Sequence, residues 1–488
     1  MRYKVAFYDF GSTAIMHRHL IGMARSEGSS VSFCAIQPNP YYRALMREVL
    51  EPADILDVFS ALPRQQTSGD PSVLASYEGD FIADLAALKR TWRRRRGAWW
   101  FDHGIAIYKL YKEFLVSRQA THLFMPVIET PEAKIAVAAA RELRLGVVAP
   151  AFMRNVDGAY FSSDCVETPP LYARATAETR AWAAQFVREF RESPLPAQRR
   201  PDVVIRDGDN EILECYAPPL RQRMLRFAKA AVERPDLFEP VFIRQSVMRN
   251  FAFIREPIRR RRERRNALEY DIADLNGLPE RFIYYPLQYT PEASINTPAP
   301  FYVDQIRVVD KLRLNMPNGC ILVVKEHPAC LEMRPTAFLR KLRRLPGVML
   351  ANFKVPSLEL VKRSALTATV TGTAAFEAFL LGRPSMLLGP GMPSWLIGTH
   401  PPTGDVRAAI AAAIDKAPSD EFIIERLAQF FSVRYPFAYG SVHEPGEPVL
   451  RRGNMRRMWE ALKDHLERER QAKEWTQSAP AEARAIAG

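Results

Sequence analysis

The segment CILVVKEHP, residues 320–328, joins an apolar run to a lysine, a glutamate, a histidine and a proline. The run Cys320–Val324 is short and rich in branched side chains, which predicts a buried β-strand. In an open parallel α/β sheet, ligands bind at the carboxyl ends of the strands. Lys325 and His327 follow this strand directly, so the segment predicts a sheet and a ligand site at its edge.

An alternation of strands and helices continues on both sides of this segment. Short apolar runs predict further strands at residues 282–286, 348–351, 368–371 and 385–388. Apolar residues at helical spacing predict intervening helices at 302–315, 336–345, 357–363 and 374–381. Strands that alternate with helices of this length are typical of a parallel sheet, so we expect an α/β domain over residues 281–440.

The N-terminal third of the chain shows the same alternation and predicts a second α/β domain over residues 1–165. Strands are predicted at 4–9, 31–36, 122–127 and 146–149, and helices at 14–25 and 132–143. The first strand leads into the helix through the small-residue turn Gly11–Thr13, as in many doubly wound sheets. No GxGxxG accompanies this turn, so the pattern favours the fold without identifying a ligand.

Residues 166–280 interrupt the alternation and are predicted to be a basic, helical insert between the two domains. Over 251–270 the sequence has seven arginines and three glutamates, with Arg259, Arg260, Arg261 and Arg262 in succession. One interpretation is a linker helix with a solvated face. Another is peripheral contact with an anionic membrane, which we also consider for the arginine- and tryptophan-rich run at 92–100. Nucleic-acid binding is not expected, because no recognised nucleic-acid-binding motif accompanies the arginines.

Composition limits the class of protein. The chain has 488 residues, 47% of them hydrophobic, and a formal net charge of +13, which favours anionic partners. No apolar run is long enough for a membrane-spanning helix, and the N-terminus lacks a signal-peptide pattern. The five cysteines are scattered without CxxC spacing. We therefore expect a cytoplasmic protein, with the inner face of the membrane as an alternative location. Residues 441–475 predict a C-terminal helical segment, and 476–488 a disordered tail.

Three clusters of polar residues stand at predicted strand ends of the C-terminal domain. The first cluster, Lys325, His327 and Pro328, could meet a phosphate. The second, Thr371-Gly372-Thr373 followed by Glu377, could present backbone N–H groups to an anion and a carboxylate to a ribose. The third, Gln288 and Glu292, lies in a proline-flanked loop. The alternatives are a strand end with a satisfied histidine for the first cluster, and a capped helix with an exposed glutamate for the second.

Together these clusters resemble the bacterial capsule polysaccharide biosynthesis family, which includes Kdo transferases. The resemblance rests on the order of YPLQYTPE (285–292), YVDQ (302–305), KEHP (325–328), TGTAAFEA (371–378) and GRP (382–384). It implies a GT-B fold, in which two Rossmann-like domains face each other across a cleft. The N-terminal domain would bind the acceptor, and the C-terminal domain would bind the nucleotide-sugar.

The resemblance also implies roles for individual residues. His327 and Pro328 would contact the nucleotide phosphate, Thr371 and Thr373 would help to bind it, and Glu377 would hold the ribose. A catalytic acid is expected in the N-terminal domain, within an acidic-acidic-Gly motif. The nearest match is Val156-Asp157-Gly158, which lacks the first acid. Asp157 is therefore the predicted base or nucleophile, with Glu129 and Glu132 in reserve, and the alternative is a simple turn.

The function predicted from these features is glycosyl transfer in surface (capsular) polysaccharide biosynthesis. The donor would be a nucleotide-activated sugar, with a CMP-Kdo-like donor favoured, and the acceptor a glycan or glycolipid. No cofactor is expected, and no pair of acids persuasively predicts a metal site. Three alternatives stay open: a CDP-polyol phosphotransferase of the teichoic-acid kind, a sugar-nucleotide 2-epimerase, and a non-catalytic nucleotide-sugar-binding member of a capsule assembly.

Overall fold

The fold is that of a computed structural model of the chain. It describes every residue except 1–2, 10, 40–41, 64–69, 75–76, 78–80, 82–98, 126–127, 129, 154–155, 165, 171, 195–212, 214–219, 236–251, 290–292, 297, 328–329, 331–333, 399–403, 440–447 and 479–488. Of the predicted site residues, Glu129, Glu292 and Pro328 lie outside the described residues, as does most of the arginine- and tryptophan-rich run.

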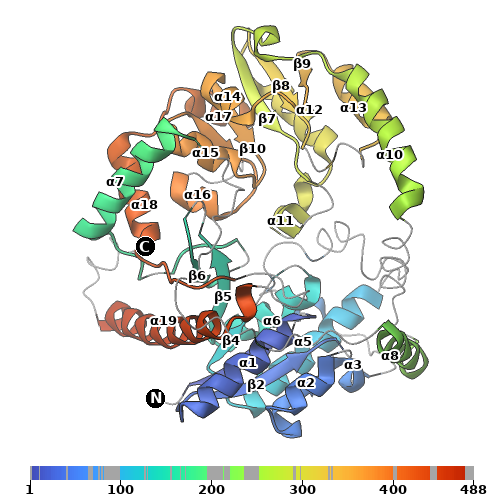
Figure 1. Ribbon diagram of the computed structural model, residues 1–488, viewed down its shortest axis with the longest axis vertical. Coiled ribbons are helices and arrows are strands. Elements are labelled where there is room, and N and C mark those ends of the chain that lie inside the picture. The colour runs from blue at the N-terminus through green and yellow to red at the C-terminus, as the bar shows by residue number, and fades with distance from the viewer. Residues whose placement is uncertain are drawn as a thin grey trace.

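The N-terminal lobe is built on a six-stranded sheet in the order β3-β2-β1-β4-β5-β6 (Figure 1). All neighbouring strands are parallel except β5 and β6, which form an antiparallel pair. The strands are β1 Lys4–Tyr8, β2 Ser32–Gln37, β3 Ile55–Asp57, β4 His122–Phe124, β5 Gly146–Phe152 and β6 Ala159–Ser162. The helices are α1 Thr13–Ser26, α2 Arg43–Arg47, α3 Val58–Ala61, α5 Trp99–Ser117 and α6 Pro131–Glu142.

Alternating side chains of β1 show why this sheet is covered on both faces. Ala6 and Tyr8 belong to a buried cluster with residues of α5 and α6. Val5 and Phe7 point to the opposite face and join a second cluster with residues of α1. A strand with apolar residues in both orientations is stable only between two layers of helices.

The C-terminal lobe contains a five-stranded parallel sheet in the order β11-β10-β7-β8-β9. Its strands are β7 Phe282–Pro286, β8 Ile321–Lys325, β9 Val348–Ala351, β10 Leu366–Thr369 and β11 Ser385–Leu387. Its helices are α11 Ala293–Asn296, α12 Gln305–Asn315, α13 Thr336–Arg343, α14 Ser357–Arg363, α15 Ala374–Leu380, α16 Met392–Ile397, α17 Val406–Ile414 and α18 Asp420–Phe431. Residues of α12, α13 and α17 share one core cluster with the sheet, and residues of α14 and α15 share another.

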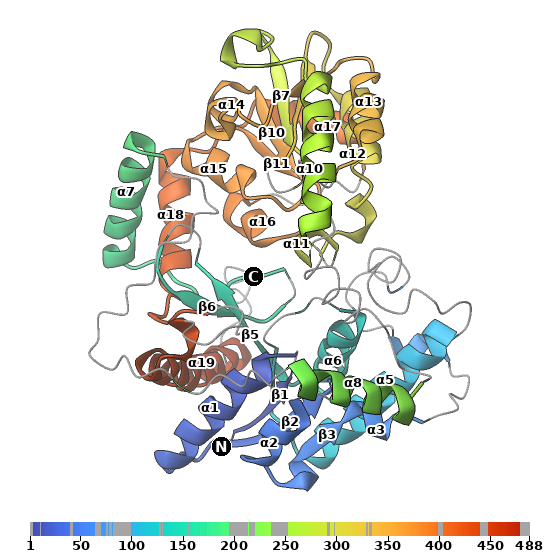
Figure 2. The same cartoon turned by 45° about the vertical axis from the view of Figure 1, so that its right-hand side comes forward.

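The predicted fold class is confirmed, since the chain forms two α/β lobes with mainly parallel sheets. The described helices of the predicted insert, however, lie against different parts of the molecule (Figure 2). Helix α7, Ala177–Glu192, packs on α18, and α10, Ala252–Asn266, packs on α13. After α8, Leu220–Glu233, the Arg234 side chain donates to the carbonyls of Phe59 and Leu62 in the N-terminal lobe. The insert is therefore not one separate body.

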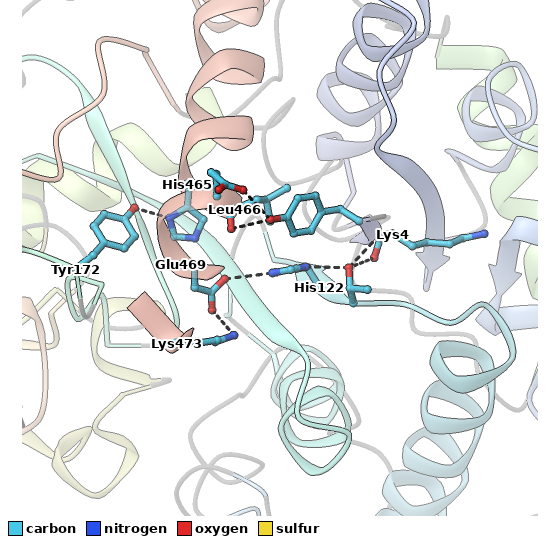
Figure 3. Close-up of polar contacts among 10 residues, drawn as sticks. Lys4, His122, Tyr172, His465, Leu466, Glu469 and Lys473 are labelled. Carbon is cyan, nitrogen blue, oxygen red and sulfur yellow. Dashed lines mark hydrogen bonds and ion pairs between the residues drawn. The ribbon is translucent and has the colours of Figure 1, made fainter. Parts of the chain in front are cut away.

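The C-terminal helix α19, Arg452–Ser478, returns to the N-terminal lobe and packs along α1. Figure 3 shows its polar contacts: His122 Nε2 on β4 lies 3.2 Å from Glu469 Oε2, and the Tyr172 hydroxyl lies 2.6 Å from His465 Nδ1. Helix α19 also continues through residues 476–478, where the sequence predicts the start of a disordered tail. The end of α19 therefore differs from the predicted boundary at residue 475, and residues 479–488 of the predicted tail lie outside the described residues.

The described part of the chain contains neither a membrane-spanning helix nor a cluster of metal ligands. No helix within the described part of the chain has the length and apolar character needed to cross a bilayer. Arg260 and Arg261 in α10 are exposed and Arg262 is half-buried, so much of the arginine run faces solvent. Among the described residues, no three His, Cys, Asp or Glu side chains gather as metal ligands.

Candidate functional site

Loops that follow β7 and β10 meet at the carboxyl edge of the five-stranded sheet. The Gln288 side chain donates through Nε2 to Thr369 Oγ1 over 2.9 Å. Thr369 Oγ1 also accepts the backbone N–H of Gly372 at 3.2 Å. A Cβ atom on residue 372 would lie 2.6 Å from Thr369 Oγ1 and 3.1 Å from Gln288 Nε2, so a glycine is needed here. The structure thus brings together Gln288 and Gly372, two of the predicted site residues.

A buried ion pair connects the loops after β7 and β8. Arg334 Nε lies 2.9 Å from Glu326 Oε2, and both side chains are almost fully buried. The same guanidinium donates through Nη2 to the backbone carbonyl of Gln288 at 2.8 Å. Glu326 Oε1 accepts the backbone N–H of His327 at 2.7 Å. These contacts fix the backbone from which the His327 side chain extends.

Lys325, the last residue of β8, is a buried cation. Its Nζ donates to Ser357 Oγ at 2.6 Å, at the first residue of α14. Burial lowers the pKa of Lys325 to about 8, although the nearby Glu377 carboxylate opposes this shift. Ser357 and Glu377 also act on the Tyr284 hydroxyl, whose pKa is raised chiefly by burial. One polar cluster therefore lies beside the strand ends and contains Lys325, Ser357, Glu377 and Tyr284.

The predicted residues of the turn before α15 occupy different settings. β10 ends at Thr369, so Thr371 lies in the turn and not on the strand as predicted. Thr373 occupies the N-cap position of α15, but its side chain makes no capping hydrogen bond. Glu377 is only 5% exposed. This burial contradicts the alternative of a capped helix with an exposed glutamate, because the carboxylate lies beside Lys325.

His327 is half-buried and its ring centroid lies 5.7 Å from that of Tyr289. It is two residues beyond Lys325, in the loop that the Glu326–Arg334 pair holds. An imidazole in this position could donate a hydrogen bond to an oxyanion bound at the strand ends. The structure therefore places His327 at the same sheet edge as the other described nucleotide-binding candidates.

Asp157 lies in the hairpin between β5 and β6, in contact with the C-terminal part of the chain. Its backbone carbonyl accepts a hydrogen bond from Arg434 Nε at 2.6 Å. Its Oδ1 atom is buried and makes no hydrogen bond with any described residue. Gly158 has φ +110°, and a Cβ there would lie 2.5 Å from the Tyr435 carbonyl oxygen. Backbone geometry and close packing therefore explain why residue 158 is a glycine, but no described contact explains the carboxylate of Asp157.

Glu132, a reserve candidate, is the second residue of α6 and is half-buried. Its negative charge contributes to the raised pKa values of Tyr8 and Tyr111, for which burial is the main cause. Glu132 therefore lies near two buried hydroxyls on the other side of β4 from the Asp157 hairpin. The assignment of Asp157 or Glu132 as the catalytic acid stays a prediction.

The N-terminal lobe also contains a buried polar pair, Asp9 and His17, that the sequence did not predict. Asp9 Oδ1 lies 2.6 Å from His17 Nδ1, and both side chains are fully buried. Burial raises the pKa of Asp9, although the His17 hydrogen bond opposes this. The His17 ring stacks on Phe7 at 4.3 Å between centroids and meets the edge of Phe124. This enclosure makes the pair part of the core.

Sequence reasoning also missed three residues of the candidate site itself: Arg334, Ser357 and Thr369. Arg334 follows Glu326 by eight residues, and Ser357 follows Lys325 by 32. No local motif links such positions, because their proximity arises only when the strands align. Thr369 had a usable signal, since it stands two residues before Thr371 at the end of a predicted strand.

The chain resembles known proteins in fold but not detectably in sequence. No protein-family model and no curated protein sequence matches the chain. Solved structures that match include two Kdo transferases, named KpsC, from Thermosulfurimonas dismutans. The beta Kdo 2,4 transferase is 13% identical, with 64% of this chain and 79% of that chain covered and a TM-score of 0.33. The beta Kdo 2,7 transferase is 11% identical, with 73% and 89% covered and a TM-score of 0.33.

A third match is the UDP-GlcNAc 2-epimerase of Methanocaldococcus jannaschii. It is 11% identical to this chain, with 88% of this chain and 99% of that chain covered and a TM-score of 0.23. The structural neighbours therefore include both Kdo transferases and UDP-GlcNAc 2-epimerases.

Proposed function

We propose that this protein is a glycosyltransferase that takes a sugar from a nucleotide-activated donor and transfers it to a glycan or glycolipid. One observation carries the proposal. A lysine at the end of β8 is buried beside a buried glutamate, in a cluster at the carboxyl edge of a parallel sheet. This edge is where open α/β sheets bind ligands, and the Lys325 ammonium there supplies a positive charge that an anionic group can approach.

The residues of this edge suit the phosphate of a nucleotide. The Lys325 ammonium supplies a positive charge in a setting with little water, where it attracts an anion more strongly than at the surface. His327 can donate a second hydrogen bond. Gly372, without a Cβ, allows Thr369 and Gln288 to pack closely against the turn before α15. Glu377 would accept hydrogen bonds from ribose hydroxyls, as the resemblance to the capsule family implies.

The reaction needs two further events that these groups can assist. The bond between the anomeric carbon and the phosphate oxygen breaks, and Lys325 and His327 stabilise the negative charge that develops on the departing nucleotide. An acceptor hydroxyl attacks the anomeric carbon and loses its proton to a carboxylate. We assign this base role to Asp157, because its Oδ1 atom is buried without a hydrogen-bond partner in the described chain. Glu132 is the reserve.

The donor is proposed to be a CMP-sugar of the Kdo kind. This choice rests on the resemblance of the KEHP and TGTAAFEA segments to the capsule family. A single phosphate also needs less neutralisation than a diphosphate, which fits a site whose described cations are Lys325 and an arginine, Arg334, that is already paired with Glu326.

Thermal unfolding in the presence of CMP, CDP, UDP and GDP tests the proposal directly. We expect CMP to raise the unfolding temperature most, because a ligand that binds only the folded state stabilises it. The loss of this effect in His327→Ala, with the ligand-free unfolding temperature unchanged, would support the site. No stabilisation by any of the four nucleotides would overturn the proposal.

Product analysis separates transfer from the related reactions. Transfer releases free nucleotide and lengthens a glycan acceptor. A polyol phosphotransferase would instead consume a CDP-polyol and add phosphorus to the acceptor. An epimerase would convert UDP-GlcNAc into an isomer of the same mass without an acceptor. Detection of either of the last two products would replace the proposed activity.

A further inference from the structure

One face of α10 carries an arginine cluster that the proposed reaction does not use. Arg261, Arg262 and Arg265 line a cavity of about 140 Å³, and Thr336, the first residue of α13, completes its described lining. Figure 2 shows α10 lying against the C-terminal lobe beside α13. The cavity therefore lies on the same lobe as the Lys325 cluster, but none of its described lining residues belongs to that cluster.

Two of the arginines that line this cavity, Arg261 and Arg265, carry charges that no described carboxylate pairs with. Arg261 and Arg265 are one helical turn apart, where like charges repel and destabilise a helix. Neither forms an ion pair with any described residue. The carboxylates of Glu269 and Asp271, which follow α10, are already bound by Arg340 and Arg343 of α13. The lining itself contains no acidic side chain in the described chain.

The backbone that presents these arginines is held in place. Asn266, the last residue of α10, is buried and donates through Nδ2 to the Arg334 carbonyl at 3.2 Å. Its Oδ1 accepts the Thr336 hydroxyl at 2.7 Å. These bonds join the end of α10 to the start of α13, so the two walls of the cavity cannot separate freely. A fixed backbone on both sides of the cavity means that ligand binding need order only the arginine side chains, which lowers its entropic cost.

We propose that Arg261, Arg262 and Arg265 form a binding site for a phosphate group, separate from the proposed nucleotide site. Guanidinium groups bind oxyanions through paired N–H donors in a fixed plane. Three guanidiniums that converge from one helix face offer donors in several directions, which matches the tetrahedral oxygens of phosphate better than the planar pair of a carboxylate. The hydroxyl of Thr336 already donates to Asn266, so the arginines supply the charge.

Phosphorus NMR with inorganic phosphate tests this site. The titration uses the His327→Ala chain, in which the proposed nucleotide site is weakened by the loss of one phosphate donor. In this background we expect the double variant Arg261→Gln/Arg265→Gln to weaken phosphate binding at least about tenfold, which corresponds to about 1.4 kcal/mol. Unchanged affinity in this variant would overturn the proposal, as would the absence of phosphate binding in the His327→Ala chain.

A matched control comes from the same helix. Arg260→Gln/Arg264→Gln removes the same charge at the same spacing, from residues that do not line the cavity. This control should keep phosphate affinity within about twofold of its parent. An equal loss in both double variants would mean that only net charge matters, and the site would be rejected. Nucleotide binding to the chain with His327 intact reports separately on the proposed function.

A phosphate could belong to a soluble ligand or to a lipid headgroup. Sedimentation with phosphatidylcholine vesicles, with and without phosphatidylglycerol, distinguishes the two sources. If Arg261→Gln/Arg265→Gln loses binding to the anionic vesicles and Arg260→Gln/Arg264→Gln does not, the site holds a lipid phosphate. If no chain sediments while phosphate binding still depends on Arg261 and Arg265, the site serves a soluble phosphate ligand. Either result supports the site and assigns its source.

Discussion

Arg334 holds Glu326 in a buried ion pair, with 2.9 Å between Nε and Oε2, and at the same time binds the carbonyl of Gln288. One side chain thus connects the loops that follow two adjacent strands. Removal of one partner from a buried pair leaves an uncompensated charge, which typically costs about 3–5 kcal/mol. The pair therefore stabilises the backbone geometry of the candidate site.

Arg334→Met should lower the free energy of unfolding by about 3–5 kcal/mol, because Glu326 keeps a buried charge without its partner. Urea unfolding followed by circular dichroism measures this change. The double variant Arg334→Met/Glu326→Met provides the control, since it removes both charges and should recover part of the lost stability. A double variant that is less stable than Arg334→Met would contradict this account.

His327→Ala should reduce kcat/KM roughly 100-fold, the loss typical of one hydrogen-bond donor to a developing oxyanion. The half-buried ring contributes little to the core, so the unfolding temperature should change little. Steady-state kinetics with the donor that the nucleotide panel selects measures the effect. As a control, Tyr289→Phe keeps the neighbouring ring and should retain activity within a few-fold. Full activity of His327→Ala would remove this histidine from the site.

Nucleotide affinity should fall as the pH rises through about 8, because burial lowers the pKa of Lys325 to about 8 and the ammonium loses its proton there. The phosphate favours the protonated lysine, so binding above this pH should take up a proton. Calorimetric titration in buffers of different ionisation enthalpy measures the uptake. Lys325→Met should abolish both nucleotide affinity and its pH dependence. A pH-independent affinity in the parent chain would contradict a role for Lys325 in binding the phosphate.

The same lysine predicts how stability without ligand depends on pH. In the unfolded chain the lysine keeps its proton up to its ordinary pKa of 10.5, while in the folded chain it loses the proton near pH 8. The unfolded state therefore binds more protons in this interval, and the lysine's contribution to stability rises with pH. Urea unfolding of the parent and of Lys325→Met, at about pH 7 and about pH 9.5, isolates this contribution. The free energy of unfolding of the parent should increase relative to that of the variant at the higher pH.

Gly372→Ala should destabilise the chain by about 1–3 kcal/mol and weaken nucleotide binding, because its Cβ would lie 2.6 Å from Thr369 Oγ1. Gly22→Ala is the matched control, since Gly22 lies within α1 and a Cβ there meets nothing within 4 Å. That substitution should stabilise by roughly 0.5–1 kcal/mol, as expected for an open position in a helix. Equal effects of the two substitutions on nucleotide binding would argue against a close approach at Gly372.

Asp157→Asn should lower turnover by at least about 100-fold while donor affinity stays the same, because a base acts on the acceptor and not on the nucleotide. Kinetics measures the first effect, and nucleotide-dependent thermal stabilisation measures the second. Glu132→Gln, measured in the same way, tests the alternative candidate for the base. If only Glu132→Gln is inactive, the base role moves from the β5–β6 hairpin to the start of α6.

The sequence allowed the C-terminal sheet to be predicted closely. The strands at 282–286 and 348–351 were placed as found, because each is a short apolar run between polar turns. The predicted strand at 368–371 lies two residues later than β10, since Thr alternates with small apolar residues through 367–371 and marks no clear strand end. β6 was missed, because its pairing with β5 depends on a hairpin rather than on a crossover helix.

Contacts distant in sequence could not be predicted. The bond from Arg434 to the carbonyl of Asp157 spans 277 positions, and it shows that the hairpin is partly a packing element. The same holds for Lys325 and Ser357, whose bond depends on the register of the sheet and on the start of α14. Residue types and strand ends identify which side chains can bind a ligand, but only the tertiary structure shows which of them share a partner.

The position of α19 has a consequence for how the chain folds during synthesis. Trp459 lies in the core cluster that contains Val5 and Phe7, and its ring is 6.0 Å from that of Phe33. These aromatic and aliphatic side chains emerge from the ribosome more than 400 residues before Trp459 does. The five-stranded sheet can close over its own helices earlier, so the lobe translated first is completed last. Until then, the part of this core that α19 covers is exposed to chaperones and to other nascent chains.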